Sequence, residues 1–132
     1  MNEVIVSIEA EVNPTEDPEK VKTAIESIFQ QSSIEFTAHK RGNLVVAKIE
    51  KKEGLMRFYT LLRQERILPA ARRVLTKGIS GVNITFYLNK QAAYVRRISF
   101  CDPLGESPLG SIKVEMKSND PRALIDWLAP RS

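Results

Sequence analysis

The chain has 132 residues, of which 42% are hydrophobic. This size and composition predict a single globular domain with a hydrophobic core and argue against a disordered chain. Its formal net charge of +4 and isoelectric point near 9.3 favour an anionic partner without requiring one. No apolar run approaches the roughly 18–20 residues that cross a bilayer, and the N-terminus lacks the basic region of a signal peptide. The single cysteine, Cys101, has no partner for an internal disulfide, so we expect a reducing cytoplasm.

The first fifty residues predict a strand, a helix and a hairpin. Apolar residues occupy every second position from Val4 to Val12, which is typical of a half-buried strand. Asp17 as N-cap and Pro18 at the first helical position begin an amphipathic helix that reaches Phe29. The hairpin then has strands near 34–38 and 44–49, joined by a turn at 39–43.

The next stretch predicts two helices, over 55–65 and 67–77. The apolar stripe moves to the opposite side of the helix after Arg66, and Pro69 lies close to that change. Gly78 is expected to end the second helix.

The rest of the chain returns to strands and closes with a helix. Asp120 is a candidate N-cap and Pro121 a candidate first helical residue for that final helix. The order β-α-β-β-α-α-β-β-β-α, which contains hairpins, predicts an α+β fold with one mostly antiparallel or mixed sheet and helices on one face. The preceding elements are a strand at 82–87, a helical turn at 88–93, a strand at 96–100, a loop at 102–110 and a strand at 112–116.

Positive charge is concentrated between Arg57 and Arg97. That segment holds nine Lys and Arg against one acid, Glu65, for a net of +8, whereas the segments before and after it carry −3 and −1. A phosphate backbone needs several cations on one surface, because its affinity comes from the release of condensed counterions. Arginine also makes bidentate hydrogen bonds to phosphate and stacks on bases. The candidate nucleic-acid-binding residues are Arg63, Arg66, Arg72, Arg73, Lys77, Lys90, Arg96 and Arg97, with Tyr87 and Tyr94 as candidate stacking residues.

The alternative interpretation of this segment is a solvated helix face whose cations pair with the acidic flanks. Polar residues at Asn89–Gln91 are compatible with a phosphate contact, although N-capping by Asn89 is the favoured interpretation. The carboxylates of Glu16 and Asp17 are compatible with a metal, although a helix start explains them better. No Gly-rich phosphate loop is present.

The residues of catalytic and metal sites are sparse. One histidine, His39, and one cysteine, with no CxxC or HxxxH spacing, argue against structural zinc. No cue indicates an activated Cys101 thiol, which we interpret as a small buried hydrophobe. The sequence therefore predicts no catalytic residue, cofactor or small-molecule substrate.

Three stretches carry a family resemblance: EVNPTEDPEKVKTAIESIF at 11–29, RILPAARRVLTKG with ITFYLNKQAAYV within 66–95, and SPLGSIKVEM at 107–116. They resemble the archaeal uncharacterised protein family 0201, over nearly the whole chain. The resemblance implies a fold similar to that of the ribosomal protein that binds 5S RNA, and it implies RNA binding. It implies no catalytic residues. The positions that match its motifs are Pro14, Thr15, Glu16, Arg72, Asn89, Lys90, Gln91, Leu109 and Gly110.

The leading hypothesis is a non-enzymatic RNA-binding module that grips phosphates with its basic surface. The rival is a structural or interaction protein, in which a sheet face with Ile5 and Val45, or the basic helices, forms a homodimer or docks on an acidic protein. The two differ in whether cations from separate elements converge on one exposed surface.

Overall fold

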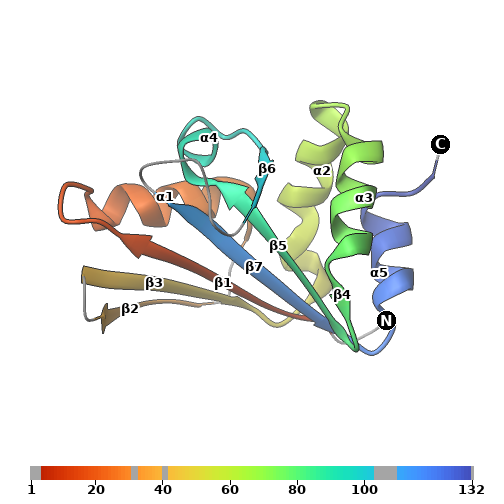
Figure 1. Cartoon of the computed structure of the whole chain (residues 1–132), viewed down its shortest axis with the longest axis horizontal. Helices are drawn as coiled ribbons and strands as arrows, with labels where there is room; N and C mark the ends of the chain where they lie inside the picture. The colour runs from red at the N-terminus through yellow and green to blue at the C-terminus, as the bar shows by residue number, and fades with distance from the viewer. Residues whose placement is uncertain (1–3, 31–32, 40–41, 103–109, 132) are drawn as a thin grey trace.

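Five α-helices cover one face of an antiparallel sheet in the part of the chain that the structure describes (Figure 1). The computed structural model describes residues 4–30, 33–39, 42–102 and 110–131, with the backbone alone described at 33–39 and 42–43. The α+β class and the order of the predicted elements are confirmed. The elements are β1 (Val4–Val12), α1 (Pro18–Ile28), β2 (Ser33–His39), β3 (Gly42–Ile49), a 3₁₀ turn (Lys52–Leu55), α2 (Met56–Gln64), α3 (Leu68–Lys77), β4 (Ile79–Ser80), β5 (Asn83–Asn89), α4 (Lys90–Tyr94), β6 (Phe100–Cys101), β7 (Ser111–Ser118) and α5 (Pro121–Leu128).

The sheet runs in the order β2-β3-β1-β7-β5-β4, and β6 also pairs with β5. Every pairing is antiparallel, and the first and last long strands, β1 and β7, lie next to each other at the centre. The register sets Ile8 level with Ala47 of β3 and with Val114 of β7. Buried residues of neighbouring strands therefore share one face of the sheet.

That shared face is the core, and the helices cover it. Val6 and Ile8 of β1 are fully buried, whereas Ile5 between its neighbours is 43% exposed. The same alternation in β5 and β7 leaves the other face of the sheet open, with exposed or half-buried side chains. Three phenylalanine rings continue the core into the helices, with Phe58 of α2 stacked between Phe29 and Phe86 at centroid distances of 5.2 and 5.7 Å. None of the helices described is long and apolar enough to cross a membrane.

The predicted helix starts are confirmed. The Asp17 side chain accepts a hydrogen bond from the Glu19 amide, and Asp120 accepts one from the Ala123 amide. Asn89 accepts one from the Ala92 amide, so it is the N-cap of α4 rather than a free phosphate ligand.

One prediction about the middle of the chain needs correction. The predicted strand at 96–100 is wrong for its first residues, because Arg96 adopts φ 57° and ends α4, which leaves Phe100–Cys101 as the strand. The prediction that Gly78 ends α3 is confirmed, and its φ is −84°. A Cβ at this position would lie 2.1 Å from the Thr85 carbonyl oxygen, so glycine is required by the close approach of α3 to β5. Residues 40–41 of the predicted turn at 39–43, and most of the predicted loop at 102–110, lie outside the described residues.

Candidate nucleic-acid interface

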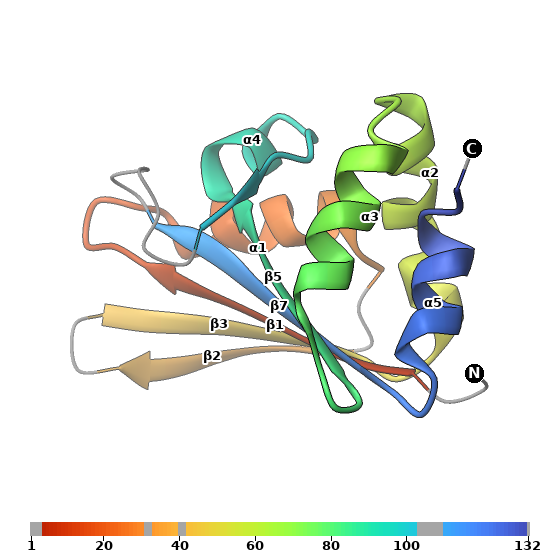
Figure 2. The ribbon, with the colours of Figure 1, turned by 45° about the vertical axis from the view of Figure 1, so that its right-hand side comes forward.

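Helices α2, α3 and α5 form a layer at one end of the sheet, and α3 and α5 lie side by side in both views (Figure 2). Aromatic rings hold α5 against α2, since Tyr59 and Trp127 lie 4.8 Å apart between centroids. The Arg63 guanidinium lies over the Tyr59 ring at 3.4 Å from its centroid, and Lys52 lies 4.7 Å from the Trp127 centroid. Trp127 is thus partly buried and packs against the core.

Arg66 forms the turn between α2 and α3. Its φ of 57° is left-handed, and its amide donates to the Arg63 carbonyl while the Ile67 amide donates to the Leu62 carbonyl. These two hydrogen bonds define a Schellman C-cap with arginine where glycine is usual. The same two bonds recur at the end of α4, where Arg96 has φ 57°. Both turns hold an exposed arginine in a backbone conformation that favours glycine.

The Arg66→Gly variant is expected to be more stable than the natural protein by up to about 1 kcal/mol. Relief of the left-handed strain, about 1–2 kcal/mol, exceeds the entropy that glycine adds to the unfolded chain, about 0.5–1 kcal/mol. Urea unfolding followed by circular dichroism measures the change. Arg73→Gly, at an exposed position inside α3, is the control and is expected to lose about 1 kcal/mol. Equal losses in both variants would contradict the assigned turn.

Two of the predicted arginines cap the C-terminal end of α5. Arg63 donates to the carbonyls of Trp127 at 3.3 Å and Leu128 at 3.1 Å. Arg72 donates to the Ala129 carbonyl at 3.1 Å and pairs with Asp126 at 2.8 Å. Cations here offset the negative end of the helix dipole. Arg63 and Arg72 therefore join the helical layer together and have fewer donors left for a ligand.

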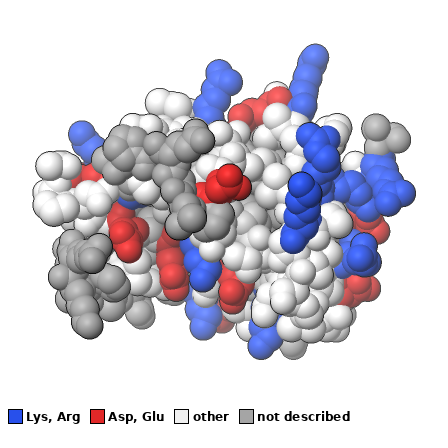
Figure 3. Space-filling model, in the orientation of Figure 1, with Lys and Arg blue, Asp and Glu red and all other residues white. Residues whose placement is uncertain are grey.

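A groove with a volume of about 850 Å³ opens beside these two arginines. Among the described residues, six cationic side chains line it and no acidic side chain does. Four of the six are exposed and, within the described residues, make no ion pair or side-chain hydrogen bond. Figure 3 shows Lys and Arg side chains gathered over α3 and α5. The lining consists of Arg63, Arg66, Leu68, Pro69, Arg72, Arg73, Thr76, Lys77, Pro130 and Arg131, and the four exposed cations are Arg66, Arg73, Lys77 and Arg131.

Glu65, the one acid of the basic segment, does not line the groove. Its carboxylate accepts the Ile98 amide at 3.0 and 3.3 Å, which ties α2 to the turn after α4. The positive charge of the groove is therefore not offset from within the segment, and the five predicted cations from 63 to 77 all meet there.

The other three predicted cations lie elsewhere. The prediction that Lys90 belongs to a solvent-facing surface is wrong, because its side chain is fully buried. Arg96 lines a different cleft, between α1 and α2. Arg97 is exposed in the turn that follows α4, and it does not line the α3–α5 groove. Spacing along the chain therefore predicted which cations share one surface only for the segment formed by α2, α3 and the turn between them.

Lys90 belongs to a buried network around Glu16. Its ammonium donates to the Glu16 carboxylate at 3.0 Å and to the Glu11 carbonyl. The same carboxylate accepts the Tyr94 hydroxyl at 2.6 Å and the Asn13 side-chain amide at 2.8 Å. The network joins the NPTED turn to α4, so two motif positions of the family resemblance, Glu16 and Lys90, meet in space and have a structural role. The Tyr94 hydroxyl is thus engaged by Glu16, and the residue is partly buried against the core.

The network shifts two ionisations. Burial alone would raise the pKa of Glu16, but the hydrogen bonds from Tyr94, Asn13 and Lys90, with the Lys90 charge, outweigh it and hold the pKa below its ordinary 4.5. Burial and the adjacent Glu16 raise the pKa of the Tyr94 hydroxyl, which therefore remains a donor.

Acid is expected to weaken the fold through Glu16. Its pKa is lower in the folded than in the unfolded chain, so the stabilisation is complete above pH 4.5 and is lost as the pH falls through the folded value. The free energy of unfolding of the natural protein should fall more steeply below pH 4.5 than that of Glu16→Gln. Urea titrations between about pH 3 and pH 7 measure this difference. Parallel curves for the two proteins would show that Glu16 is not the group responsible.

Two cations near the clefts were not among the predicted site residues. Arg131 lies outside the basic segment and reaches the groove because α5 ends beside α3. Arg57 lies inside the segment and lines the α1–α2 cleft. The segment's charge pointed to Arg57, whereas no local pattern marks Arg131.

The fold and the groove define an α+β protein with an antiparallel sheet and a cation-lined helical layer. A family model described as RNA binding matches residues 5–118. Over 127 residues the chain is 47% identical to a UPF0201 protein of Sulfurisphaera tokodaii, an alignment that covers 96% of this chain and 88% of the relative. A UPF0201 protein of Metallosphaera sedula is 43% identical over 132 residues, which cover 100% of this chain and 90% of the relative. The chain belongs to the UPF0201 family, within the RNA-binding family model, as the sequence resemblance predicted.

Solved structures agree with this assignment. The crystal structure of the UPF0201 protein from Methanococcus jannaschii matches with a TM-score of 0.85 and 36% identity, covering 97% of this chain and 94% of that one. A DUF54 protein from Methanothermobacter thermautotrophicus matches with a TM-score of 0.64 and 15% identity over 95% of both chains, which shows a shared fold alone.

Proposed function

We propose that this protein is a non-enzymatic RNA-binding module that holds the phosphates of a single strand in the α3–α5 groove. The observation that carries the proposal is the lining of that groove, in which six cations meet and, in the part of the chain that the structure describes, no acid lies. The RNA-binding family model, which spans most of the chain, supports RNA as the ligand.

The exposed cations would act by displacing counterions from the RNA backbone. Arg66, Arg73, Lys77 and Arg131 come from the α2–α3 turn, from α3 and from the segment after α5, so the positive surface is built from separate elements. Each cation that neutralises a phosphate releases condensed ions into bulk solvent, which gives affinity without base recognition.

The size of the groove suits a few nucleotides of a single strand. Its volume of about 850 Å³ is in the range of pockets that enclose one drug-sized ligand. Leu68, Pro69 and Pro130 give the lining an apolar part against which a sugar or base can pack. We therefore expect weak sequence preference, set by the backbone and by packing rather than by base edges.

Fluorescence anisotropy with a labelled oligouridylate tests the proposal. Four phosphate contacts predict that log affinity falls with log salt at a slope of about −2.8, which is a loss of roughly 50-fold between 50 and 200 mM salt. Polyglutamate of similar length is the control for a general affinity for polyanions. A flat salt response, or no binding at low salt, would refute RNA binding, and tighter binding of polyglutamate would favour an acidic protein as partner.

A further inference from the structure

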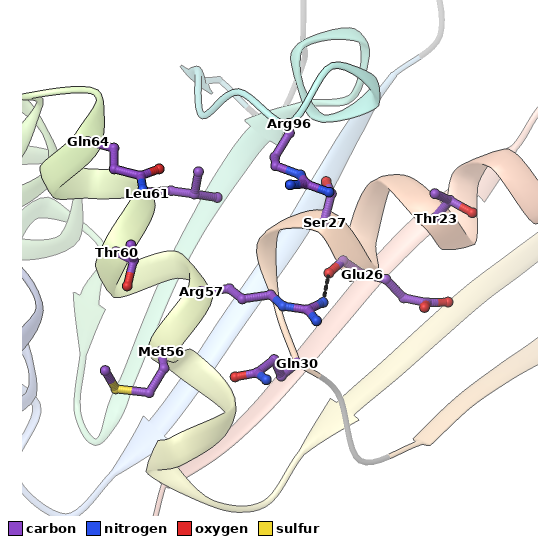
Figure 4. Close-up of a pocket in the computed structure, with 10 residues that line it drawn as sticks. All are labelled: Thr23, Glu26, Ser27, Gln30, Met56, Arg57, Thr60, Leu61, Gln64 and Arg96. Atoms are coloured by element: carbon purple, nitrogen blue, oxygen red, sulfur yellow. Dashed lines mark hydrogen bonds between the residues drawn. The ribbon is translucent and has the colours of Figure 1, made fainter.

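A second cleft with two arginines lies between α1 and α2, and it is separate from the α3–α5 groove (Figure 4). Its volume is about 520 Å³. Most of the described residues that line it are polar or charged, and the lining consists of Thr23, Glu26, Ser27, Gln30, Met56, Arg57, Thr60, Leu61, Gln64 and Arg96.

The two arginines come from distant parts of the chain and reach into the same space. Arg57 lies in the first turn of α2, and Arg96 lies in the turn after α4. Figure 4 shows both guanidinium groups over the C-terminal end of α1, beside Ser27. Two guanidinium groups that converge on one cleft are a fitting arrangement for an anion with several acceptor oxygens, such as phosphate.

The acid of the cleft does not neutralise them. Glu26 is the one acidic residue among the described residues of the lining, and its carboxylate points along α1, away from both guanidinium groups (Figure 4). Neither arginine forms an ion pair with a carboxylate of the described residues. The side chains of Gln30, Thr60 and Gln64 add hydrogen-bonding groups around the opening.

Helix capping explains one of these arginines but not the other. Arg57 donates to the Glu26 carbonyl at 2.6 Å in the last turn of α1, a turn without basic residues of its own. Arg96 makes no side-chain hydrogen bond within the described residues and holds a left-handed backbone that glycine would adopt at lower cost. A strained, exposed arginine directed into a cleft indicates a ligand.

Helix α2 separates this cleft from the α3–α5 groove. Residues 57, 60, 61 and 64 line the cleft, whereas Arg63 lines the groove, as expected for two sides of one helix. Arg66 follows at the C-terminal end of α2, where it also lines the groove. An RNA strand that leaves the α3–α5 groove past Arg66 would cross the C-terminal end of α2 and enter the α1–α2 cleft.

We propose that the α1–α2 cleft is a second phosphate site, in which Arg57 and Arg96 hold a phosphodiester of the RNA strand that occupies the groove. This inference rests on the proposed function. It extends the interface across α2 and predicts that RNA gains affinity when it is long enough to occupy both places.

The test compares Arg96→Gly and Arg57→Gln with Lys117→Gln, using two RNA lengths. Glycine suits the turn at position 96 and removes the cation, so this variant is expected to fold. Lys117 is exposed on the open face of the sheet, away from the helices, and its substitution removes the same charge. Anisotropy is measured with oligouridylates of about 4 and about 16 nucleotides, the range of single-strand site sizes. Urea unfolding accompanies each variant.

Arg96→Gly and Arg57→Gln are each expected to weaken binding of the longer RNA by about tenfold and to make its salt slope shallower by about 0.7. The shorter RNA is expected to occupy the groove and not the cleft. The natural protein and all three variants should therefore bind it with equal affinity. If both variants match Lys117→Gln on the longer RNA, or if both lengths lose affinity equally, the second site is refuted while groove binding stands. If the natural protein binds neither RNA, the proposed function fails and this inference fails with it.

Discussion

Lys90→Met is expected to lower the free energy of unfolding by about 3–5 kcal/mol, the usual cost of removing one partner from a buried ion pair. The Lys90 and Glu16 side chains are 0% and 5% exposed. Methionine fills the space of the lysine stem, so most of the loss comes from the Glu16 carboxylate, which would remain buried without its cation. Urea unfolding monitored by circular dichroism gives the difference.

Two further variants separate this cause from simple loss of packing. Adding Glu16→Gln to Lys90→Met removes the orphaned charge, so the double variant should be more stable than Lys90→Met alone. Lys117→Met, at an exposed site, should change stability by no more than about 0.5 kcal/mol. A Lys90→Met protein with normal stability and lost RNA binding would return Lys90 to the interface and contradict its assignment to the core.

Arg73→Gln with Lys77→Gln is expected to weaken RNA binding by roughly a hundredfold at low salt, since a hydrogen bond to a charged group contributes about 1.5 kcal/mol or more. Both residues are exposed on α3 and line the groove. Loss of two phosphate contacts should also make the salt slope shallower by about 1.4. Anisotropy titrations at several salt concentrations measure both quantities.

Lys48→Gln with Lys117→Gln is the charge-matched control for this double variant. These two lysines are exposed on the open face of the sheet, in β3 and β7, and removing them lowers the net charge equally. The control should bind RNA with nearly natural affinity and an unchanged salt slope. Equal weakening by the two double variants would mean that net charge, and not the groove, determines binding.

The choice of residues in these tests follows from the separate roles of the groove cations. Arg63 and Arg72 bind carbonyls at the end of α5, so their substitution would loosen the helical layer as well as remove charge. Arg73 and Lys77 make no such contacts within the described residues, so their substitution is expected to change RNA binding without loosening the helical layer. A survey of all basic residues by alanine substitution would mix the two effects.

The sequence by itself determined the elements and their order, because the signals act over a few residues. Asp17 caps α1 through the Glu19 amide two residues on, and Asp120 caps α5 through the amide three residues on. The change of apolar stripe after Arg66 and the position of Pro69 located the break between α2 and α3. The same short range made the clustering of cations between 63 and 77 predictable, since those residues lie on two consecutive helices and the turn between them.

Only the tertiary structure decided which cations face solvent. Lys90 pairs with Glu16, which lies 74 residues earlier in the chain. Arg63 and Arg72 donate hydrogen bonds to carbonyls that lie 65 and 57 residues away. Arg131 joins the groove because α5 packs beside α3. Residue type and spacing do not encode such partners, because burial and pairing depend on how the helices and strands pack across the whole sheet.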